Sequence, residues 1–383
     1  PPTSWLGCPR SCAAERGVLA DGMRPIPTDP LAQRVLLNGL KGVGPVTVRR
    51  LRDAFGGDLS VALGAPAEQL AGVEGVSKPV AAAIAAREFD WAREMGRARE
   101  LGFRLLSADD DAWPSPLTRL WDPPLVLYAE GAAFPTERAV GVIGSRHCTA
   151  YGASLARAFA RDLAREGWWI VSGLARGIDT AAHEGALDAG GRTAAVVGHG
   201  LDLTFPPEAV RLRTKMKAEG CVLSEFPLGR PADRQTFPQR NRIVAGLVRV
   251  MVVVETDVDG GSMITARFAA DLGKTICAVP GRADSPSSRG CHALIRDGAT
   301  LVTSVDEILA ELGESRGSPA LALAADPPEF ARWLPHFAGG AAHDADSLAA
   351  LADCSAAEAA VSLTMMELRG LLARRPDGRH ERA

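Results

Sequence analysis

Residues 168–179 read Trp-Trp-Ile-Val-Ser-Gly-Leu-Ala-Arg-Gly-Ile-Asp, a short apolar run that leads directly into a glycine-rich loop. Runs of the same kind recur along the chain, and helical patterns fill most of the intervals between them. The runs are 140–143, 168–171, 193–197, 221–223, 250–254, 275–279 and 300–302. Near-continuous Val and Ile runs that alternate with helices are typical of a parallel sheet covered on both faces. The sequence therefore predicts an α/β fold, a Rossmann-like doubly wound and mostly parallel sheet, over residues 106–312.

Helical patterns precede this region. Residues 39–45 (Gly-Leu-Lys-Gly-Val-Gly-Pro) and 73–77 (Val-Glu-Gly-Val-Ser) each separate two apolar-periodic runs, as in a helix, a tight glycine turn and a second helix. Residues 30–105 are thus predicted to form a small helical domain of the helix-hairpin-helix (SAM-like) type. Its turns would present N–H groups to a phosphate, although two ordinary packed hairpins explain the pattern equally well. A further helix is expected over about 90–101, and a strand within 123–128.

The C-terminal part divides into a linker and a small domain. Residues 313–342 are rich in Ala, Pro and Gly and break the periodicity, as a linker does. Three apolar-periodic stretches then follow within 347–372, and Asp377-Gly378 is a two-residue hairpin signal. Three short helices and a hairpin predict a winged helix over 343–383. The mixed charge of this tail leaves open whether it contacts DNA or protein.

Composition and charge narrow the function classes. Residues 1–29 are predicted to be a disordered or non-native leader, because Met23 is the first methionine and the helical signals begin later. The net charge of −3 argues against a uniformly basic surface, but residues 138–250 hold 16 Lys and Arg against 10 Asp and Glu. A local anionic ligand is therefore favoured. No apolar run is long enough to span a bilayer, and the seven scattered cysteines lack metal-ligand spacing, which predicts a cytoplasmic protein without a metal site.

Four glycine-bearing loops follow strand-like runs. They are 144–146, 172–179, 198–200 and 259–262. Such loops fall at the carboxyl ends of the strands, where doubly wound sheets bind their ligands. Glycine allows the backbone to approach an anion closely, and Arg146 and Arg176 add positive charge. The sequence predicts an anion-binding rim along this edge of the sheet.

Two further segments carry candidate site residues. Residues 238–243 (Pro-Gln-Arg-Asn-Arg-Ile) place Arg240 and Arg242 around an asparagine at an expected helix start, which suits bidentate phosphate contacts. A solvated arginine pair beside an N-cap Asn is the alternative. His183 is interpreted as a packed residue that bonds a backbone carbonyl, rather than a general base, because no nucleophile elbow accompanies it.

Motifs of nucleotide enzymes are incomplete in this chain. Gly273-Lys274-Thr275 ends like a P-loop, but Phe268 stands where the first glycine is required. Residues 198–203 have a leucine in place of the third glycine of a dinucleotide fingerprint. We therefore predict a protein without catalytic residues and without a cofactor.

The motifs together resemble the bacterial DNA-processing protein A (DprA/Smf) family in order and spacing, over about residues 30–380. The segments that carry the resemblance are 144–146 with 151–152, 172–179 with 182–183, 224–225, 237–242, 261–266 and 280–281. It implies single-stranded DNA binding without catalysis, a homodimer formed through the Rossmann-like domain, and loading of RecA recombinase during natural transformation. No membrane is implied. The residues assigned to DNA are Gly144, Ser145, Arg146, Ser172, Gly173, Arg176, Gly177, Arg240, Asn241, Arg242, Gly261 and Ser262.

Two residues depart from the pattern of that family. His292 and Glu208 each stand where the family usually has asparagine, and Glu208 would weaken the attraction for phosphate if it faces the rim. Two other interpretations compete. A Rossmann-like nucleotide phosphoribohydrolase needs a glutamate about one turn after its glycine-rich stretch, and residues 259–267 lack one. A sensor of small nucleotides remains open, because a phosphate-binding rim does not reveal the length of its ligand.

Overall fold

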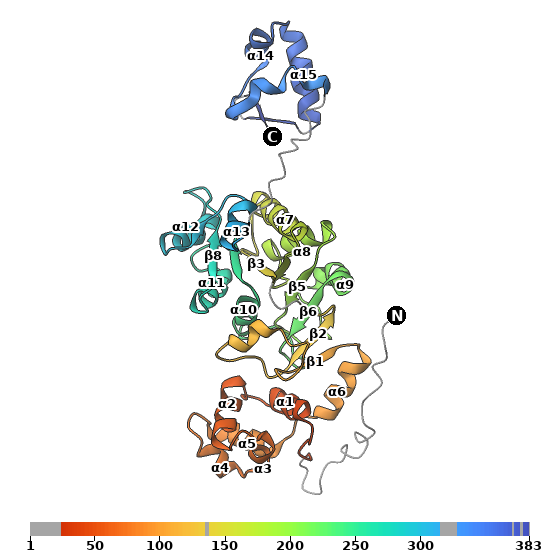
Figure 1. The fold of residues 1–383 in the computed structure, drawn as a ribbon, viewed down its shortest axis with the longest axis vertical. Helices are drawn as coiled ribbons and strands as arrows, with labels where there is room; N and C mark the ends of the chain where they lie inside the picture. Colours follow the sequence, from red (N-terminus) through yellow and green to blue (C-terminus); the bar gives the residue numbers. More distant parts are fainter. Residues whose placement is uncertain (1–23, 135–137, 315–327, 370, 376–377, 383) are drawn as a thin grey trace. The chain divides into compact units, whose positions relative to one another are not determined.

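The computed structural model describes residues 24–134, 138–314, 328–369, 371–375 and 378–382, which group into two compact units divided at residue 315 (Figure 1). Residues 1–23 of the predicted leader lie outside the described residues. Residues 24–29 belong to the fold, because Arg24 forms a 2.9 Å ion pair with Asp90 and Asp29 accepts the Ala32 N–H. The predicted leader is therefore wrong for residues 24–29.

A nine-stranded sheet forms the centre of the first unit. Its strands lie in the order β1-β2-β6-β5-β4-β3-β7-β8-β9, with β1 and β2 antiparallel and all pairs from β6 to β9 parallel. They are β1 (Arg104–Leu106), β2 (Leu127–Gly131), β3 (Ala139–Ile143), β4 (Trp169–Ser172), β5 (Thr193–Val196), β6 (Cys221–Ser224), β7 (Val250–Val253), β8 (Thr275–Ala278) and β9 (Thr300–Leu301). The predicted mostly parallel, doubly wound sheet is confirmed. β1 was not predicted, since three residues are too few to show a period.

Helices cover both faces of this sheet (Figure 1). One face carries α7 (Ala150–Arg165), α8 (Ile178–Asp188), α9 (Val210–Glu219) and α13 (Val305–Glu311), and the other carries α10 (Thr236–Leu247), α11 (Gly261–Asp271) and α12 (Pro286–Arg296). Successive side chains of a strand point to opposite faces. Val140 and Val142 of β3 accordingly pack with α7 and α8, whereas Ala139 and Ile143 pack with α10 and α11.

Among the described residues, which begin at Arg24, six short helices precede the sheet. They are α1 (Pro30–Gly39), α2 (Pro45–Ala54), α3 (Leu59–Gly64), α4 (Ala67–Ala71), α5 (Lys78–Ala86) and α6 (Trp91–Glu100). Both predicted glycine turns are present, and Gly42 and Gly75 have φ values of 81° and 74°, a region that favours glycine. The helices share a hydrophobic cluster with Tyr128 and Val222 of the sheet, so the helical region packs directly on the sheet.

The second unit contains α14 (Ala345–Ala352), α15 (Ala356–Leu368) and an antiparallel pair formed by β10 (Leu372–Arg374) and β11 (His380–Arg382). The predicted hairpin is present, although Asp377 of its turn lies outside the described residues. The expected third helix near 367–372 is wrong, because α15 continues through Leu368 and Leu372 already begins β10.

The linker predicted over 313–342 is too long. Two 3-10 helices, η4 (Pro328–Phe330) and η5 (Leu334–Gly340), precede α14. Phe330, Trp333 and Phe337 are buried in one cluster with Leu348 and Leu363. These aromatic side chains anchor the segment. The linker prediction rested on the content of Ala, Pro and Gly and did not take them into account.

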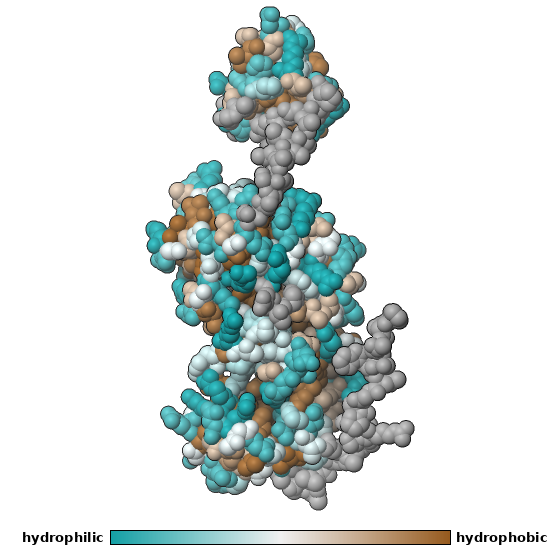
Figure 2. All heavy atoms as spheres, viewed as in Figure 1, coloured by the Kyte–Doolittle hydropathy of each residue, from teal (hydrophilic) through white to brown (hydrophobic). Residues whose placement is uncertain are grey.

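The apolar side chains thus collect in buried clusters, and the face drawn in Figure 2 mixes hydrophilic and hydrophobic residues on both units. Within the described part of the chain, no single helix is long and apolar enough to cross a bilayer. α14 and α15 reach that length and composition only together, across a bend of 109°.

Candidate functional site

The site lies where the direction of the sheet reverses. From β3 the chain runs through β4 and β5 to β6 on one side, and from β7 through β8 to β9 on the other. The loops that follow β3 and β7 therefore diverge and leave a crevice at the carboxyl edge. A pocket of about 400 Å³ occupies this crevice, bounded by residues 143–147, 173–179, 256–265 and the first turns of α10.

Eight of the twelve predicted site residues line this pocket. They are Gly144, Ser145, Arg146, Gly173, Arg240, Asn241, Gly261 and Ser262. Arg176 lies at a smaller neighbouring recess, whereas Ser172, Gly177 and Arg242 line neither cavity. The pocket also contains Arg234 and Phe237, which were not among the predicted site residues.

Two glycines allow the loop after β3 to touch the loops after β7 and β4. A Cβ on Gly144 would lie 2.7 Å from the carbonyl oxygen of Glu255, far closer than van der Waals contact. Gly177 has a φ of 76° and lies against the carbonyl oxygen of Ser145, so a side chain there would be strained and would also collide. Ser172 supports the same junction, because its hydroxyl donates to the Val142 carbonyl at 2.7 Å.

Arg146 and Arg234 are the exposed cations of the pocket. The Arg146 guanidinium lies over the ring of Phe237, with Cζ 4.8 Å from the ring centre. Neither arginine forms an ion pair with any residue that the structure describes. The sequence signal that could have indicated Arg234 is its position four residues before the Pro-Gln-Arg-Asn segment, just ahead of α10.

Arg240 also lines the pocket but is held within its wall. The residue is only 4% exposed, and its guanidinium donates to the Val196 carbonyl. Burial lowers the pKa of Arg240 to about 10, while the negative charge of Asp179 opposes that shift. Asp179 in turn accepts the backbone N–H groups of Gly173 and Ala175, at 3.1 and 3.3 Å. Asp179 therefore fixes the glycine loop after β4, and the Arg240 guanidinium packs against Gly173 of that loop.

Arg242 does not reach the pocket, contrary to the prediction. Its guanidinium lies 2.6 Å from Glu225 and 2.9 Å from Asp122, and the residue is 7% exposed. Arg240 and Arg242 both lie on α10, where each residue adds about 100° of rotation. The two side chains consequently leave the helix on nearly opposite sides, and Arg242 forms a buried ion pair instead of a rim contact.

Arg176 forms an ion pair with Glu208, on the short helix η3 (Pro207–Ala209). Glu208 therefore faces the rim, in the orientation expected to weaken phosphate binding. The hydrogen bond from Arg176 lowers the pKa of Glu208, which keeps this carboxylate charged at neutral pH. The positive charge of Arg176, which the sequence analysis assigned to phosphate binding, is thus neutralised by Glu208 of the same chain.

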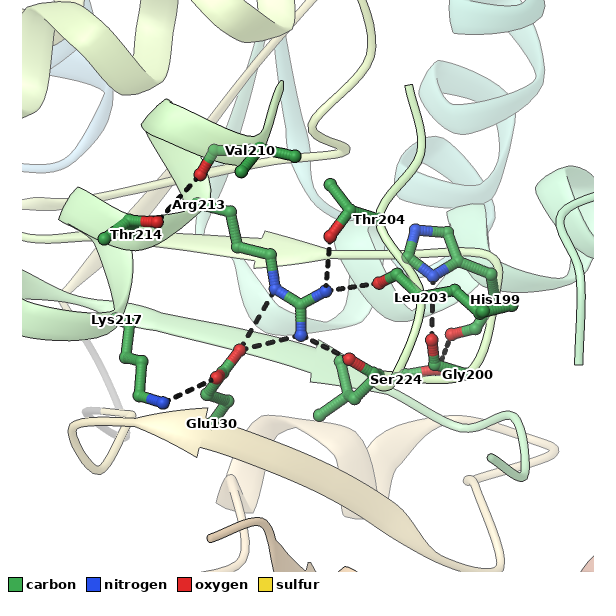
Figure 3. Close-up of polar contacts among 11 residues, drawn as sticks. Glu130, His199, Gly200, Leu203, Thr204, Val210, Arg213, Thr214, Lys217 and Ser224 are labelled. Atoms are coloured by element: carbon green, nitrogen blue, oxygen red, sulfur yellow. Dashed lines mark hydrogen bonds and ion pairs between the residues drawn. The ribbon is translucent and has the colours of Figure 1, made fainter. Parts of the chain in front are cut away.

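The loop that leads to Glu208 is anchored to the sheet. Arg213 of α9 donates to the Leu203 carbonyl and to the Thr204 hydroxyl, and it pairs with Glu130 of β2 at 2.8 Å (Figure 3). Lys217 pairs with the same carboxylate at 3.1 Å. The side chains of Arg213 and Glu130 are about one-tenth exposed, so this network holds the loop firmly against β2.

The two histidines singled out by the sequence have structural partners. His183 is fully buried, with Nδ1 2.6 Å from the Thr193 hydroxyl, and burial lowers its pKa to about 3. It is a packed residue, as interpreted, but bonds a hydroxyl rather than a backbone carbonyl. The Nε2 atom of His292 lies 3.0 Å from the Gly281 carbonyl oxygen, so this residue supports the loop after β8. Among the described residues, no group of three or more His, Cys, Asp or Glu is arranged to hold a metal ion.

Residues 104–313, a range that contains all nine strands of the sheet, match the sequence model of a family described as DNA recombination-mediator protein A. This chain belongs to that family. The chain is 37% identical to Protein Smf of Synechocystis over 284 residues, which cover 72% of this chain and 70% of that protein. It is 42% identical to the DNA processing protein DprA of Streptococcus pneumoniae over 213 residues, which cover 55% of this chain and 74% of that protein.

Two solved structures of family members have the same fold. The crystal structure of DprA from Streptococcus pneumoniae superposes with a TM-score of 0.62 at 34% identity, covering 74% of this chain and 95% of that one. DNA processing protein A from Helicobacter pylori gives a TM-score of 0.50 at 29% identity, covering 55% and 95% respectively. The latter structure is described as giving insight into the single-stranded DNA binding mode of that protein.

Proposed function

We propose that this member of the family binds single-stranded DNA in the pocket between β3 and β7 and catalyses no reaction on it. The observation that carries the proposal is the pair Arg146 and Arg234, two exposed guanidinium groups on the wall of a glycine-lined pocket. Neither has a carboxylate partner among the described residues. Unpaired arginines at a concave site attract phosphate groups, and each can donate two hydrogen bonds to one phosphate.

The start of α11 adds to this attraction. Gly260, Gly261 and Ser262 line the pocket, and the N-cap Gly260 supplies no side chain to accept the first N–H groups of the helix. These N–H groups and the positive end of the helix dipole favour an anion at this point. Backbone donors read phosphate rather than base identity, so the proposal predicts little dependence on DNA sequence.

An aromatic ring beside a cation favours a single strand over a duplex. Phe237 lies under the Arg146 guanidinium, and its ring is 6.0 Å from that of Phe205. Unstacked bases of single strands pack on aromatic rings, whereas the bases of a duplex are already stacked inside the helix. The DNA binding named for the Helicobacter pylori relative supports the same ligand here.

The acidic residues of the pocket support binding rather than catalysis. Asp179 accepts two backbone N–H groups, and Asp257 pairs with Arg289 at 2.7 Å. Both carboxylates therefore already have partners. A phosphoribohydrolase would instead need a carboxylate free to stabilise a cationic sugar, so the pocket supports the binding function better than this alternative.

We also propose that the bound strand is handed to RecA recombinase during DNA uptake, in the cytoplasm, by a homodimer formed through the sheet domain. The family membership and the DNA-processing names of the relatives support this role. This role is tested by measuring the DNA-dependent ATP hydrolysis of RecA on single strands coated with a competing single-strand-binding protein. The protein should shorten the lag before hydrolysis, and an unchanged lag at saturating protein would reject the role.

A fluorescence anisotropy titration tests the DNA-binding function. Labelled single strands, duplexes of the same sequence and mononucleotides are compared across a range of salt concentrations. We expect single strands to bind most tightly, with log affinity falling linearly against log salt. Equal affinity for the duplex, or tighter binding of the mononucleotide, would exclude the proposal and favour a nucleotide sensor. Base release from nucleoside monophosphates that disappears in Arg146→Ala would show an enzyme.

A further inference from the structure

A second basic cavity lies at the opposite edge of the sheet. It encloses about 340 Å³, and Arg119, Arg249 and Lys274 line it. Arg119 ends the short helix η2 (Ser115–Arg119), Arg249 directly precedes β7, and Lys274 directly precedes β8. The cavity is therefore at the amino ends of the parallel strands, whereas the first pocket is at their carboxyl ends. No acidic residue is part of its lining.

The three cations lie close together without a negative partner. None of them forms an ion pair with a described residue, although Arg249 lies over the Trp168 ring and donates to the Leu312 carbonyl at 3.3 Å. Burial lowers the pKa of Lys274, and the positive charges of Arg119 and Arg249 lower it further. Like charges held together are unfavourable, and an anion bound between them would remove this repulsion.

Helix ends explain only part of this arrangement. The C-termini of helices gather at the amino edge of a parallel sheet, and their partial negative charge of about half an electron attracts cations. The bond from Arg249 to the Leu312 carbonyl is such a contact. The side chains of Arg119 and Lys274, in contrast, donate to no carbonyl or carboxylate in the described part of the chain. The cavity therefore remains positive after the helix ends are counted.

We propose that this cavity is a second binding site, for a phosphate group. Arg119 offers a planar fork of donors, Lys274 offers a point charge, and Ser115 adds a hydroxyl to the lining. The phosphate is carried either by the backbone of a nucleic acid or by a free nucleotide, since both present the same oxygen atoms. The site does not depend on the DNA-binding role of the first pocket.

Calorimetric titration of inorganic pyrophosphate into the full chain tests the site. The variant Arg146→Ala/Arg234→Ala removes the two exposed cations of the first pocket, so that the remaining heat reports on the second cavity. We expect Lys274→Gln in this background to weaken binding about tenfold or more, the effect of one lost charge-assisted contact. Lys215→Gln removes an exposed lysine of α9 and should leave the affinity unchanged. Absence of pyrophosphate binding in the background variant would overturn the proposal.

Thermal unfolding separates a ligand site from a structural role. If Lys274 binds an anion, Lys274→Gln should not lower the Tm of the ligand-free protein, since it removes repulsion. A lowered Tm with unchanged pyrophosphate affinity would show that Lys274 only caps neighbouring helices, and would reject the site. Arg119→Gln serves as a second variant with the same expectations.

Two sets of ligands distinguish a nucleic acid backbone from a free nucleotide as the carrier of the phosphate. If the site holds a nucleic acid backbone, Lys274→Gln should weaken the binding of a single strand of about 30 nucleotides and lower the salt slope of that binding by about 0.7. The binding of a strand of about 6 nucleotides should not change. If it holds a free nucleotide, the same change should weaken ATP and pyrophosphate but neither strand. Either result retains the phosphate site and assigns its ligand. A variant that alters none of these ligands would exclude the site.

Discussion

Arg176 and Glu208 form an ion pair beside the pocket between β3 and β7, with 59% and 54% of their side chains exposed. Glu208 thereby occupies the position from which a phosphate would otherwise contact Arg176. Arg213 and Glu130 anchor the loop that leads to Glu208. The ion pair between Arg176 and Glu208 is therefore present without any movement of that loop. We therefore expect Arg176 to contribute little to DNA binding until Glu208 is neutralised.

Glu208→Gln should raise the affinity for single-stranded DNA about twofold to fivefold, the range expected when an exposed ion pair no longer competes with a phosphate. The salt slope should steepen by about 0.7, since one more phosphate contact forms. Anisotropy titrations over a range of salt concentrations measure both quantities.

The matched control is Glu184→Gln, which removes the same charge from another exposed pair, with Arg157 at 2.9 Å on the outer helices. It should leave the slope unchanged. Arg176→Ala/Glu208→Gln should lose the gain of the single variant. If the double variant still binds as tightly as Glu208→Gln, the effect is one of net charge and the competition does not exist.

Arg146 and Arg242 should respond oppositely to alanine substitution. Arg242→Ala leaves the buried carboxylate of Glu225 without its partner, so the free energy of unfolding should fall by about 3 kcal/mol or more. Arg146→Ala should leave the Tm within a degree or so of wild type while weakening DNA of every sequence and making the salt slope shallower. Denaturant unfolding and DNA titration on both variants test this contrast. A stable Arg242→Ala with a reduced salt slope would place Arg242 at the DNA after all.

Alanine substitutions at Gly261 and Gly177 test two different roles of glycine. At Gly261 it leaves the backbone N–H groups accessible to a ligand, and at Gly177 it avoids backbone strain. Gly261 begins α11 and has no atom within 4 Å of an added Cβ, so Gly261→Ala should fold normally. It should nevertheless weaken single-stranded DNA, because the methyl group would stand between the phosphate and the helix N–H groups. Gly177→Ala should lower the Tm by several degrees, since its φ of 76° and its contact with Ser145 exclude a side chain. Unchanged DNA affinity in Gly261→Ala would remove this helix start from the site.

His183 should make the protein less stable in mild acid. Its pKa is about 6.5 when unfolded and about 3 when folded, so the unfolded chain binds more protons between these values. The stability it contributes is complete above pH 6.5 and is lost as the pH falls, by up to about 1.4 kcal/mol per pH unit. His183→Gln should reduce the slope of unfolding free energy against pH between about 6 and 4. The partly exposed His292 serves as the control in the variant His292→Gln, and equal slopes in wild type and His183→Gln would contradict the expectation.

The sequence alone determined the sheet and the edge that carries the pocket. Seven apolar runs predicted seven strands, because strands buried on both faces need apolar side chains at nearly every position. In a parallel arrangement the loops that follow the strands meet at one edge, so the glycines near 144, 173 and 261 could be placed together before their contacts were known.

Only the tertiary structure decided which arginines remain free to bind. Arg242 meets Asp122 across 120 residues of sequence, and Arg176 meets Glu208 across 32. No local pattern records such pairs, because a side chain's partner depends on the rotation of its helix and on the path of distant loops. For the same reason, no local pattern indicates the cluster of Arg119, Arg249 and Lys274, which come together only when the sheet forms. Local periodicity thus determines where strands and loops lie, whereas the charge left unpaired at each edge is a property of the folded chain.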